Sequence, residues 1–390
     1  MTPLSMTGQH TFFSPNKIVI GLGALANTPG EARQLGGTKA LIVTDPGVVA
    51  AGLIERLTAA LADGGIAHVI YDRVTPDPPP EIIDRGAAHY KSEGCDFVLG
   101  FGGGSSLDAA KGIGLLTANP GKIMDYCGID KVPQKGAPLI LIPTTAGTGS
   151  EVTRVLMVSD PRDGAKLPVF SPFALADAAL VDPLLSKSMP PEVTADTGID
   201  ALVHAIETYV STNATVFSDV LAERAIELIA EYLPIAWAKG SQLEARFQLS
   251  VAAALAGMAF GSGGLGAVHA LAHSLGTVEH MPHGRTNAIM LPHVMKYNLA
   301  GNPEKFAVIA ELMGYDTDGS TLMEAAGQSV RAVRDLLDAL KVSCRLADYE
   351  LPMENIPKLV AGAMRQSRLF VPNPRDLTEA DVKAIFEEAY

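Results

Sequence analysis

The chain has 390 residues, of which 47% are hydrophobic and 19% charged, so it can bury large cores and is expected to fold as two domains. The 30 Lys and Arg residues against 43 Asp and Glu residues give a formal net charge of −13, which excludes broad binding to nucleic acid or to an anionic membrane. Three widely spaced cysteines, Cys95, Cys127 and Cys344, suggest neither a disulfide framework nor a cysteine zinc site. Without a basic stretch followed by an apolar run at the N-terminus, we expect a cytoplasmic protein.

The first half alternates short apolar, β-branched runs with helical stretches. The expected strands are residues 39–45, 67–72, 96–104 and 138–145, and the expected helices lie near 47–62, 79–93 and 106–117. This alternation predicts an α/β domain over residues 1–189 with a parallel sheet and helices on both faces. Ligands of such a sheet bind at the C-terminal ends of the strands.

Two glycine-rich loops each follow an apolar strand. In GFGGGSSLDAAKG (100–112), Gly102, Gly103 and Gly104 could let backbone amides approach a pyrophosphate at a helix N-terminus. This loop lacks the usual G-x-G-x-x-G spacing, and glycine clusters at strand ends are often only turns. A second loop, PTTAGTGSE (143–151), adds hydroxyl groups. Two such loops at adjacent strand ends favour a dinucleotide site.

Asp45 closes the first expected strand, where an acid can accept hydrogen bonds from an adenosine ribose. Such an acid would repel the extra phosphate of NADP, and no basic residue precedes Arg56 in the following turn. We therefore expect NAD to be preferred over NADP. The alternative is that Asp45 only caps the helix that begins after Pro46.

From about Pro190 the strand pattern stops and apolar residues recur at helical spacing. The expected helices are residues 191–210, 215–237, 241–260, 303–314, 320–340 and 378–389, so residues 190–390 should form an all-helical domain. Within it, residues 247–278 carry no charged residue and are long enough to span a bilayer. Their glycines and histidines instead favour a buried helix pair around a polar site, and we expect no membrane partner.

Five of the nine histidines fall within 25 residues, namely His269, His273, His280, His283 and His293. His269 and His273 are four residues apart on one helical face, and His283 follows in a PHG turn that can return an imidazole to the same point. The segment 194–209 aligns a carboxylate and an imidazole at the same spacing. The pattern predicts a mononuclear metal site with the ligands Asp200, His204, His269 and His283.

Alternatives exist for each of these residues. Taken singly, His204 could be a hydrogen-bonded core histidine and Asp200 an ordinary helix-face carboxylate, but the joint pattern favours the metal site. His273 is either a fifth ligand or a group that relays a proton beside the metal, and we favour the relay because four ligands leave little room for substrate. His280 and His293 are expected to be structural.

The motifs GGGSSLDAAK, PTTAGTGSE, GIDALVHAIE, HALAHSLG, MPHGRTNAIMLPHVMKYN and PNPR resemble those of the iron-containing (group III) alcohol dehydrogenases, in the branch with lactaldehyde reductase and 1,3-propanediol dehydrogenase. The resemblance implies a nucleotide-binding α/β domain and an all-α metal-binding domain, the architecture shared with dehydroquinate synthase. It implies the same four metal ligands. The nucleotide contacts that it implies are Asp45, Gly102, Gly103, Gly104, Ser105, Thr144, Thr145 and Thr148 and, more weakly, Asp77 and Lys166. Ser274 and Arg285 depart from the family pattern.

We therefore expect an NAD-linked alcohol dehydrogenase or aldehyde reductase that acts on small primary alcohols or diols. In this reaction a metal-bound alkoxide would transfer hydride to the nicotinamide. The ligand set suits iron, zinc, cobalt or nickel, and the resemblance favours iron. Residues 152–158 are expected to form an extended strand on which Thr153, Val155 and Met157 share one face. With Phe260 they would line a narrow, apolar substrate pocket, unless these residues are plain core. We also expect a homodimer or a larger homo-oligomer.

Two other reactions are possible. A lyase of the dehydroquinate synthase kind would need several cations near the metal for its charged sugar acid, yet residues 194–284 contain only Arg224, Lys239 and Arg246. A metal-dependent hydrolase would leave both glycine-rich loops without a function.

Overall fold

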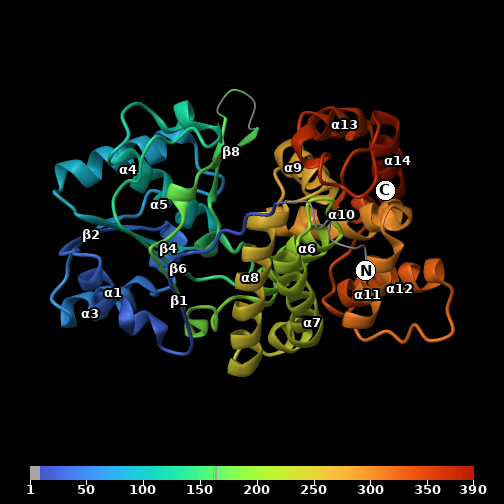
Figure 1. Cartoon of the computed structure of the whole chain (residues 1–390), viewed down its shortest axis with the longest axis horizontal. Coiled ribbons are helices and arrows are strands. Elements are labelled where there is room, and N and C mark those ends of the chain that lie inside the picture. Colours follow the sequence, from blue (N-terminus) through green and yellow to red (C-terminus); the bar gives the residue numbers. More distant parts are fainter. Residues whose placement is uncertain (1–8, 161, 163–164) are drawn as a thin grey trace. The chain divides into compact units, whose positions relative to one another are not determined.

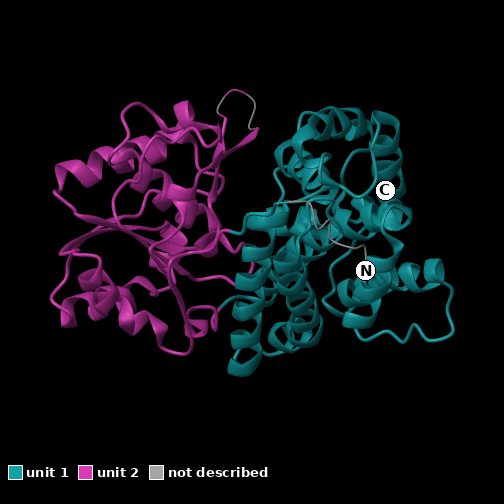
Figure 2. Ribbon diagram, in the orientation of Figure 1, with its two compact units in different colours: residues 1–12, 189–390 teal, residues 13–188 magenta. Residues whose placement is uncertain are grey.

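The computed structural model describes residues 9–160, 162 and 165–390 (Figure 1). The chain divides into two compact units, unit 2 with residues 13–188 and unit 1 with residues 1–12 and 189–390 (Figure 2). Among the described residues, every strand lies in unit 2, whereas unit 1 is helical. The fold class predicted from the sequence is confirmed. Residues 9–12 group with the helical unit, although the sequence pattern placed them in the α/β domain.

Unit 2 is built on a six-stranded sheet of order β1-β9-β6-β4-β2-β3, in which all neighbours are parallel. Its strands are β1 Ile18–Ile20, β2 Lys39–Val43, β3 Ala67–Tyr71, β4 Phe97–Gly102, β6 Leu139–Pro143 and β9 Ala178–Val181. Val43 pairs with Gly100, and Gly102 pairs with Pro143. The C-terminal ends of β2, β4 and β6 therefore lie at one edge of the sheet, where Asp45 and both glycine-rich loops begin.

The sheet is covered on both faces because alternate residues of its central strands enter different cores. Leu41 and Val98 pack in one core with residues of α4 and α5, whereas Ile42 and Leu99 pack in the other with residues of α1 and α3. The helices are α1 Thr28–Gln34, α2 Pro46–Ala50, α3 Ile54–Asp63, α4 Pro80–Ser92 and α5 Gly104–Leu116. The single helix expected over 47–62 was wrong, because Gly52, with φ +69°, separates α2 from α3.

A second sheet of three strands has the order β5-β8-β7. Its strands are β5 Gly128–Ile129, β7 Val155–Ser159 and β8 Lys166–Phe170, and β7 and β8 pair antiparallel. The extended segment expected at 152–158 thus forms a strand only from Val155 onward. Thr153, which the sequence placed on the same strand face as Val155 and Met157, precedes the strand and is buried.

Unit 1 is built of helices, several of which pack against the long, largely buried α6 (Figure 1). The helices are α6 Pro191–Val210, α7 Val216–Ala238, α8 Leu243–Gly263, α9 Ala267–Glu279, α10 His283–Asn298, α11 Pro303–Leu312, α12 Leu322–Ala339, α13 Ile356–Met364 and α14 Glu379–Ala389. No single helix in the described ranges is long and apolar enough to cross a membrane. Among the same residues, α8 and α9 together pass such a test, and they are bent by 106° at the break after Gly263.

Candidate functional site

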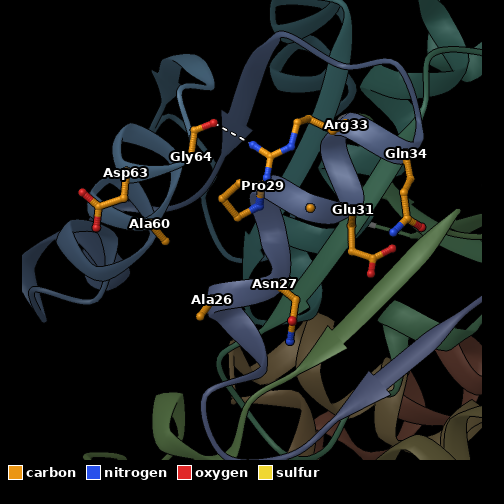
Figure 3. Close-up of a pocket in the computed structure, with 10 residues that line it drawn as sticks. Ala26, Asn27, Pro29, Glu31, Arg33, Gln34, Ala60, Asp63 and Gly64 are labelled. Atoms are coloured by element: carbon orange, nitrogen blue, oxygen red, sulfur yellow. Dashed lines mark hydrogen bonds between the residues drawn. The ribbon is translucent and has the colours of Figure 1, made fainter.

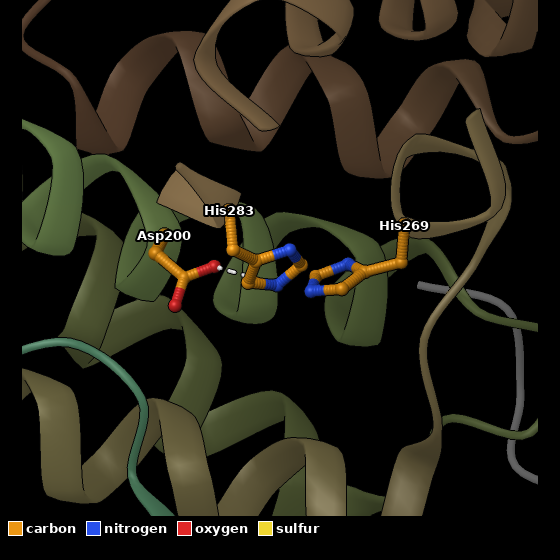
Figure 4. Close-up of side chains that lie close together, drawn as sticks. All are labelled: Asp200, His269 and His283. Atoms are coloured by element: carbon orange, nitrogen blue, oxygen red, sulfur yellow. Dashed lines mark ion pairs between the residues drawn. The ribbon is translucent and has the colours of Figure 1, made fainter. Parts of the chain in front are cut away.

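Three of the four predicted metal ligands converge from three helices of unit 1. Asp200 of α6, His269 of α9 and His283 of α10 each offer one ligand atom, and these atoms all lie within 4.8 Å of one another (Figure 4). Asp200 and His269 are 3% and 1% exposed, whereas the side chain of His283 is 31% exposed. A carboxylate and two imidazoles gathered in a mostly buried place form a donor set that suits a divalent transition metal.

The fourth predicted ligand, His204, lies beside this group, one helical turn after Asp200. Its Nε2 is 3.8 Å from Asp200 Oδ1, and its ring stacks on His269 with 4.9 Å between centroids. The ring of Phe260 lies 4.5 Å from the ring of His204. The i, i+4 spacing thus places the side chains of Asp200 and His204 on one face of α6, beside His269, and the role of His204 as a ligand stays a prediction.

His283 reaches the group by a route that the sequence did not predict. It is the first residue of α10, after Pro282, rather than part of a free turn. At Gly284 a Cβ atom would lie 2.3 Å from the backbone oxygen of Asp196, so only glycine allows α10 to approach α6 this closely. Arg285, which departs from the family pattern, donates from Nε to Asp196 Oδ1 at 2.7 Å. The Asp196 carboxylate therefore compensates the positive charge of Arg285.

Two residues that touch the predicted ligands were missed by sequence reasoning. Glu207 follows Asp200 by seven residues on the same face of α6, and its Oε2 lies 2.6 Å from His269 Nδ1. Asn287 follows His283 by one turn of α10 and donates from Nδ2 to Asp200 Oδ1 at 2.6 Å. Their spacing could have indicated both residues, because Glu207 lies seven residues after Asp200 and Asn287 lies four residues after His283, which places each on the same helix face as a predicted ligand.

His273, the predicted proton relay, lies one turn after His269 on α9 and is 8% exposed. Its ring centroid is 5.2 Å from that of His283 and 5.9 Å from that of His269. It is not among the three residues whose ligand atoms converge. His293 lies elsewhere, with Nε2 2.9 Å from the backbone oxygen of Cys344, and burial lowers its pKa.

The first glycine-rich loop of unit 2 is shaped by close packing. A Cβ at Gly102, where φ is +153°, would lie 2.7 Å from the side chain of Ser106, and a Cβ at Gly104 would lie 2.9 Å from Thr148 Cγ2. At Gly103 the nearest atom would be 3.7 Å away. α5 begins at Gly104 without a side-chain cap, so its first backbone N–H groups are suited to receive a phosphate.

The other predicted nucleotide contacts lie around this loop. Thr144 is buried and its backbone N–H donates to Gly102 O at 2.9 Å, which links the two loops. Ser105, Thr145 and Thr148 are partly exposed. Asp77 and Lys166 form an ion pair of 2.6 Å with each other. The role of all these residues in binding a nucleotide stays a prediction.

Asp45 makes two hydrogen bonds with its carboxylate. Oδ1 accepts from Val48 N at 3.0 Å and caps α2, while Oδ2 accepts from Ser106 Oγ at 2.9 Å. The cap that the sequence offered as the alternative is therefore present. It does not exclude a ribose contact, because a carboxylate has about four acceptor positions and these bonds use two.

A buried ionic cluster near the loops was not predicted. Lys111 of α5 is 0% exposed and donates to Thr153 Oγ1 at 3.1 Å and to Val155 O at 2.7 Å, with Asp108 Oδ1 3.7 Å away. Burial raises the pKa of the nearby Glu151 to about 7 and lowers the pKa of Lys111. The cluster ties α5 to the segment after the second loop. Because the Thr153 hydroxyl is engaged here, plain core describes this residue better than a pocket wall.

The remaining predicted pocket residues are divided between the units. Val155 and Met157 are partly exposed on β7 of unit 2, and Phe260 is partly exposed on α8 of unit 1. Their role in a substrate pocket stays a prediction. A separate hollow of about 490 Å³ lies on unit 2 between α1 and α3 and includes Arg33 and Gly64 (Figure 3). None of the predicted site residues lines it.

Two family models together match nearly the whole chain. A model described as iron-containing alcohol dehydrogenase matches residues 15–183, and a model of the C-terminal part of the Fe-containing alcohol dehydrogenase family matches residues 194–390. A choline dehydrogenase of Bacillus subtilis (strain 168) is 42% identical over 389 residues, which are 99% of this chain and 96% of that protein.

Solved structures agree with these matches. A crystal structure of 1,3-propanediol oxidoreductase is 38% identical, with a TM-score of 0.96 over 98% of this chain and 100% of that one. Sulfoacetaldehyde reductase from Bifidobacterium kashiwanohense, solved in complex with NAD+, is 30% identical, with a TM-score of 0.88 over 98% and 99% of the two chains.

Proposed function

Because the chain belongs to the iron-containing alcohol dehydrogenase family, we propose that it oxidises small primary alcohols or diols, or reduces the corresponding aldehydes, with NAD(H) and iron. The family confirms the oxidoreductase class that the sequence predicted, and the alternative of a dehydroquinate synthase-like lyase is not favoured.

The observation that carries the proposal is the convergence of Asp200, His269 and His283, with His204 alongside. We propose these four residues as the metal ligands. When bound, the metal would act as a Lewis acid on the substrate oxygen, and NAD would exchange the hydride. The chain supplies a buried carboxylate and imidazoles, of which only that of His283 is partly exposed, to orient these groups.

His273 is proposed as the residue that moves the hydroxyl proton of the substrate. Its ring lies beside those of His269 and His283, and four ligands already leave little room for substrate, so we assign His273 to proton transfer rather than to the metal. We expect His273→Ala to retain most of its metal and to lose turnover, measured as metal content and initial rate on the same preparation. A variant that loses the metal would instead identify His273 as a ligand.

For the nucleotide, we propose that Gly102, Gly103 and Gly104 with the second loop bind the pyrophosphate and that Asp45 faces the adenosine ribose. The Asp45 carboxylate and the extra phosphate of NADP would then lie about 5 Å apart. At an effective dielectric near 20, two like unit charges at this distance repel by about 3 kcal/mol, which makes the efficiency with NADP more than a hundredfold lower than with NAD. Asp77 and Lys166 are proposed as weaker contacts.

The substrate class rests on what surrounds the predicted ligands in unit 1. Phe260 offers an aromatic surface beside His204, and the charge of Arg285 is compensated by Asp196. Neither residue therefore favours a charged substrate. The related proteins are named for choline, 1,3-propanediol and sulfoacetaldehyde, which differ in charge, so the family match alone does not choose among them.

The three free cysteines fit the proposed cytoplasmic location, and a homo-oligomer remains our expectation.

The test is to purify the protein without chelator, measure its metal content, and follow nicotinamide absorbance with primary alcohols, diols, hydroxy acids and sugar phosphates. We expect activity with short alcohols or diols, with NAD preferred over NADP by about a hundredfold, and a ratio near one in Asp45→Gly. Equal efficiency on a C2 to C4 alcohol and a sugar phosphate would contradict the substrate class. A ratio that Asp45→Gly leaves unchanged would show that Asp45 serves only as a helix cap.

A further inference from the structure

The first turn of α9 carries His269 at its third residue and lacks a local cap. The residue before the helix is Gly266, which has no side chain to accept from the first backbone N–H groups. Helix ends fray unless these groups find partners. A ligand in the first turn would then be poorly held.

Two buried side chains from distant parts of the chain supply these partners. Asn373, in the PNPR motif, accepts from Ala267 N through Oδ1 at 3.3 Å, and Glu207 of α6 accepts from Val268 N through Oε1 at 2.6 Å. Both residues are 5% exposed. A Cβ at Gly266 would lie 3.0 Å from Glu207 Oε1 and 3.1 Å from Asn373 Oδ1, so glycine at this position lets both partners approach.

Asn373 is itself fixed by a reciprocal amide pair. Its Nδ2 donates to Asn298 Oδ1 at 2.8 Å and to Arg375 O at 2.6 Å, and its Oδ1 accepts from Asn298 Nδ2 at 2.9 Å. The end of α10 and the PNPR motif thus meet at the start of α9. These contacts give a physical role to a motif that the predicted reaction does not use.

The second oxygen of Glu207 determines which nitrogen of His269 carries the proton. Oε2 lies 2.6 Å from His269 Nδ1, and a carboxylate can only accept, so Nδ1 carries the hydrogen. In a neutral imidazole, Nε2 then has the free lone pair that a metal needs. Because Oε1 is held by Val268 N, the carboxylate cannot turn away without leaving a buried N–H group unpaired.

We propose that Glu207 is a positioning residue that fixes the tautomer of His269 and, together with Asn373, holds the first turn of α9, so that His269 Nε2 is presented as a metal ligand. This inference rests on the metal site proposed above. It assigns Glu207 a role through His269, without contact to the substrate.

Glu207→Gln tests the proposal at nearly constant volume. Val268 N–H and His269 Nδ1–H face different oxygens of Glu207, and the amide replaces one of these oxygens by an NH₂ group, which cannot accept from either donor. In metal-free protein, ¹⁵N NMR of labelled histidine should show His269 protonated at Nδ1 in the wild type and shifted toward the Nε2–H form in the variant. The affinity for added Zn²⁺ should fall about 10- to 100-fold.

Three further variants make the result specific. Glu192→Gln removes an exposed carboxylate from the same helix and should change neither the tautomer nor the affinity. Glu207→Asp, which keeps the charge but shortens the reach, should lie between the two and serves if the glutamine variant does not fold. Asn373→Ala should lower the thermal midpoint and leave the tautomer unchanged.

Wild-type tautomer and wild-type Zn²⁺ affinity in folded Glu207→Gln would overturn the inference. Because the tautomer is measured without metal, a failure of the inference about Glu207 is distinguishable from a failure of the proposed function. A wild-type protein that shows the Nδ1–H form but binds no Zn²⁺ would contradict the metal site alone.

Discussion

The two candidate binding regions are built in opposite ways. In unit 1 the predicted metal ligands are side chains of long helices, and regular spacing brings them to one face. In unit 2 the predicted nucleotide contacts lie mostly on loops, and the shape of the first glycine-rich loop depends on how closely its glycines pack against Ser106 and Thr148. Regular helices make a site that spacing reveals, whereas a loop site depends on contacts that spacing does not encode.

The regions also differ in how they use buried charge. Asp200 and Glu207 each hold groups of the predicted metal site. Lys111, Asp108 and Glu151 instead hold α5 against the segment that follows the second loop, and none is a predicted ligand. The first cluster should therefore control metal binding, and the second should control stability of the nucleotide region.

The largest effect is expected from removing a predicted ligand. His269→Ala should lose bound metal, and turnover should fall about a thousandfold, because a Lewis acid contributes several kcal/mol to such a reaction. The measurement is elemental analysis and initial rate of the folded variant. His293→Ala is the matched control, since this histidine is also buried but bonds Cys344, and it should lose stability while keeping its metal. Full metal content in His269→Ala would refute the site.

The next largest effect is a pH dependence of the free energy of unfolding that comes from Glu151 of unit 2. Burial raises the pKa of Glu151 in the folded chain to about 7, above the unfolded value of about 4.3. The contribution of Glu151 to the free energy of unfolding is therefore fully present below the unfolded pKa and is lost as the pH rises from there through 7, by up to about 4 kcal/mol.

Glu151→Gln should remove this pH-dependent loss of stability between pH 5 and 8. The measurement is the thermal midpoint of the full chain as a function of pH. Glu55→Gln, which changes an exposed carboxylate of the same unit, should keep the wild-type profile. Parallel profiles for the wild type and Glu151→Gln would show that Glu151 is not the group responsible.

The smallest expected effect comes from two glycine substitutions in the first glycine-rich loop. They distinguish a glycine that the packing of the loop requires from one that only contacts the nucleotide. Gly104→Ala places a methyl group 2.9 Å from Thr148 Cγ2, so it should destabilise the fold by about 1–3 kcal/mol and weaken NAD binding. Gly103→Ala has 3.7 Å of room, so only NAD binding should weaken. Thermal midpoints and NAD titrations of both variants decide this. If Gly103→Ala binds NAD as the wild type does, the loop does not contact the nucleotide through this residue.

Much of this architecture could be predicted because its signals are local. The strands β2, β3, β4 and β6 and the long helices of unit 1 follow apolar periodicity. Four predicted ligands follow from i, i+4 spacing and a histidine cluster. The break at Gly52 and the start of α10 at His283 depend on a single backbone conformation or a close helix approach, which periodicity does not report.

Other features escaped prediction because they join residues far apart in the sequence. Glu207 reaches His269 across 62 residues, and Asn373 reaches Ala267 across 106. Lys111 meets Thr153 and Val155 only once α5 packs beside them. An acid on a helix face or a lysine in a helix has many ordinary uses, so only the folded arrangement distinguishes these roles.

The most direct test of the account is the anomalous scattering of crystals of the wild-type protein, measured on either side of the iron absorption edge. We expect one strong peak bound by Asp200, His204, His269 and His283, with ligand distances of about 2.0–2.2 Å. A peak at any other group of residues, or one that His204 does not contact, would contradict the proposed metal centre.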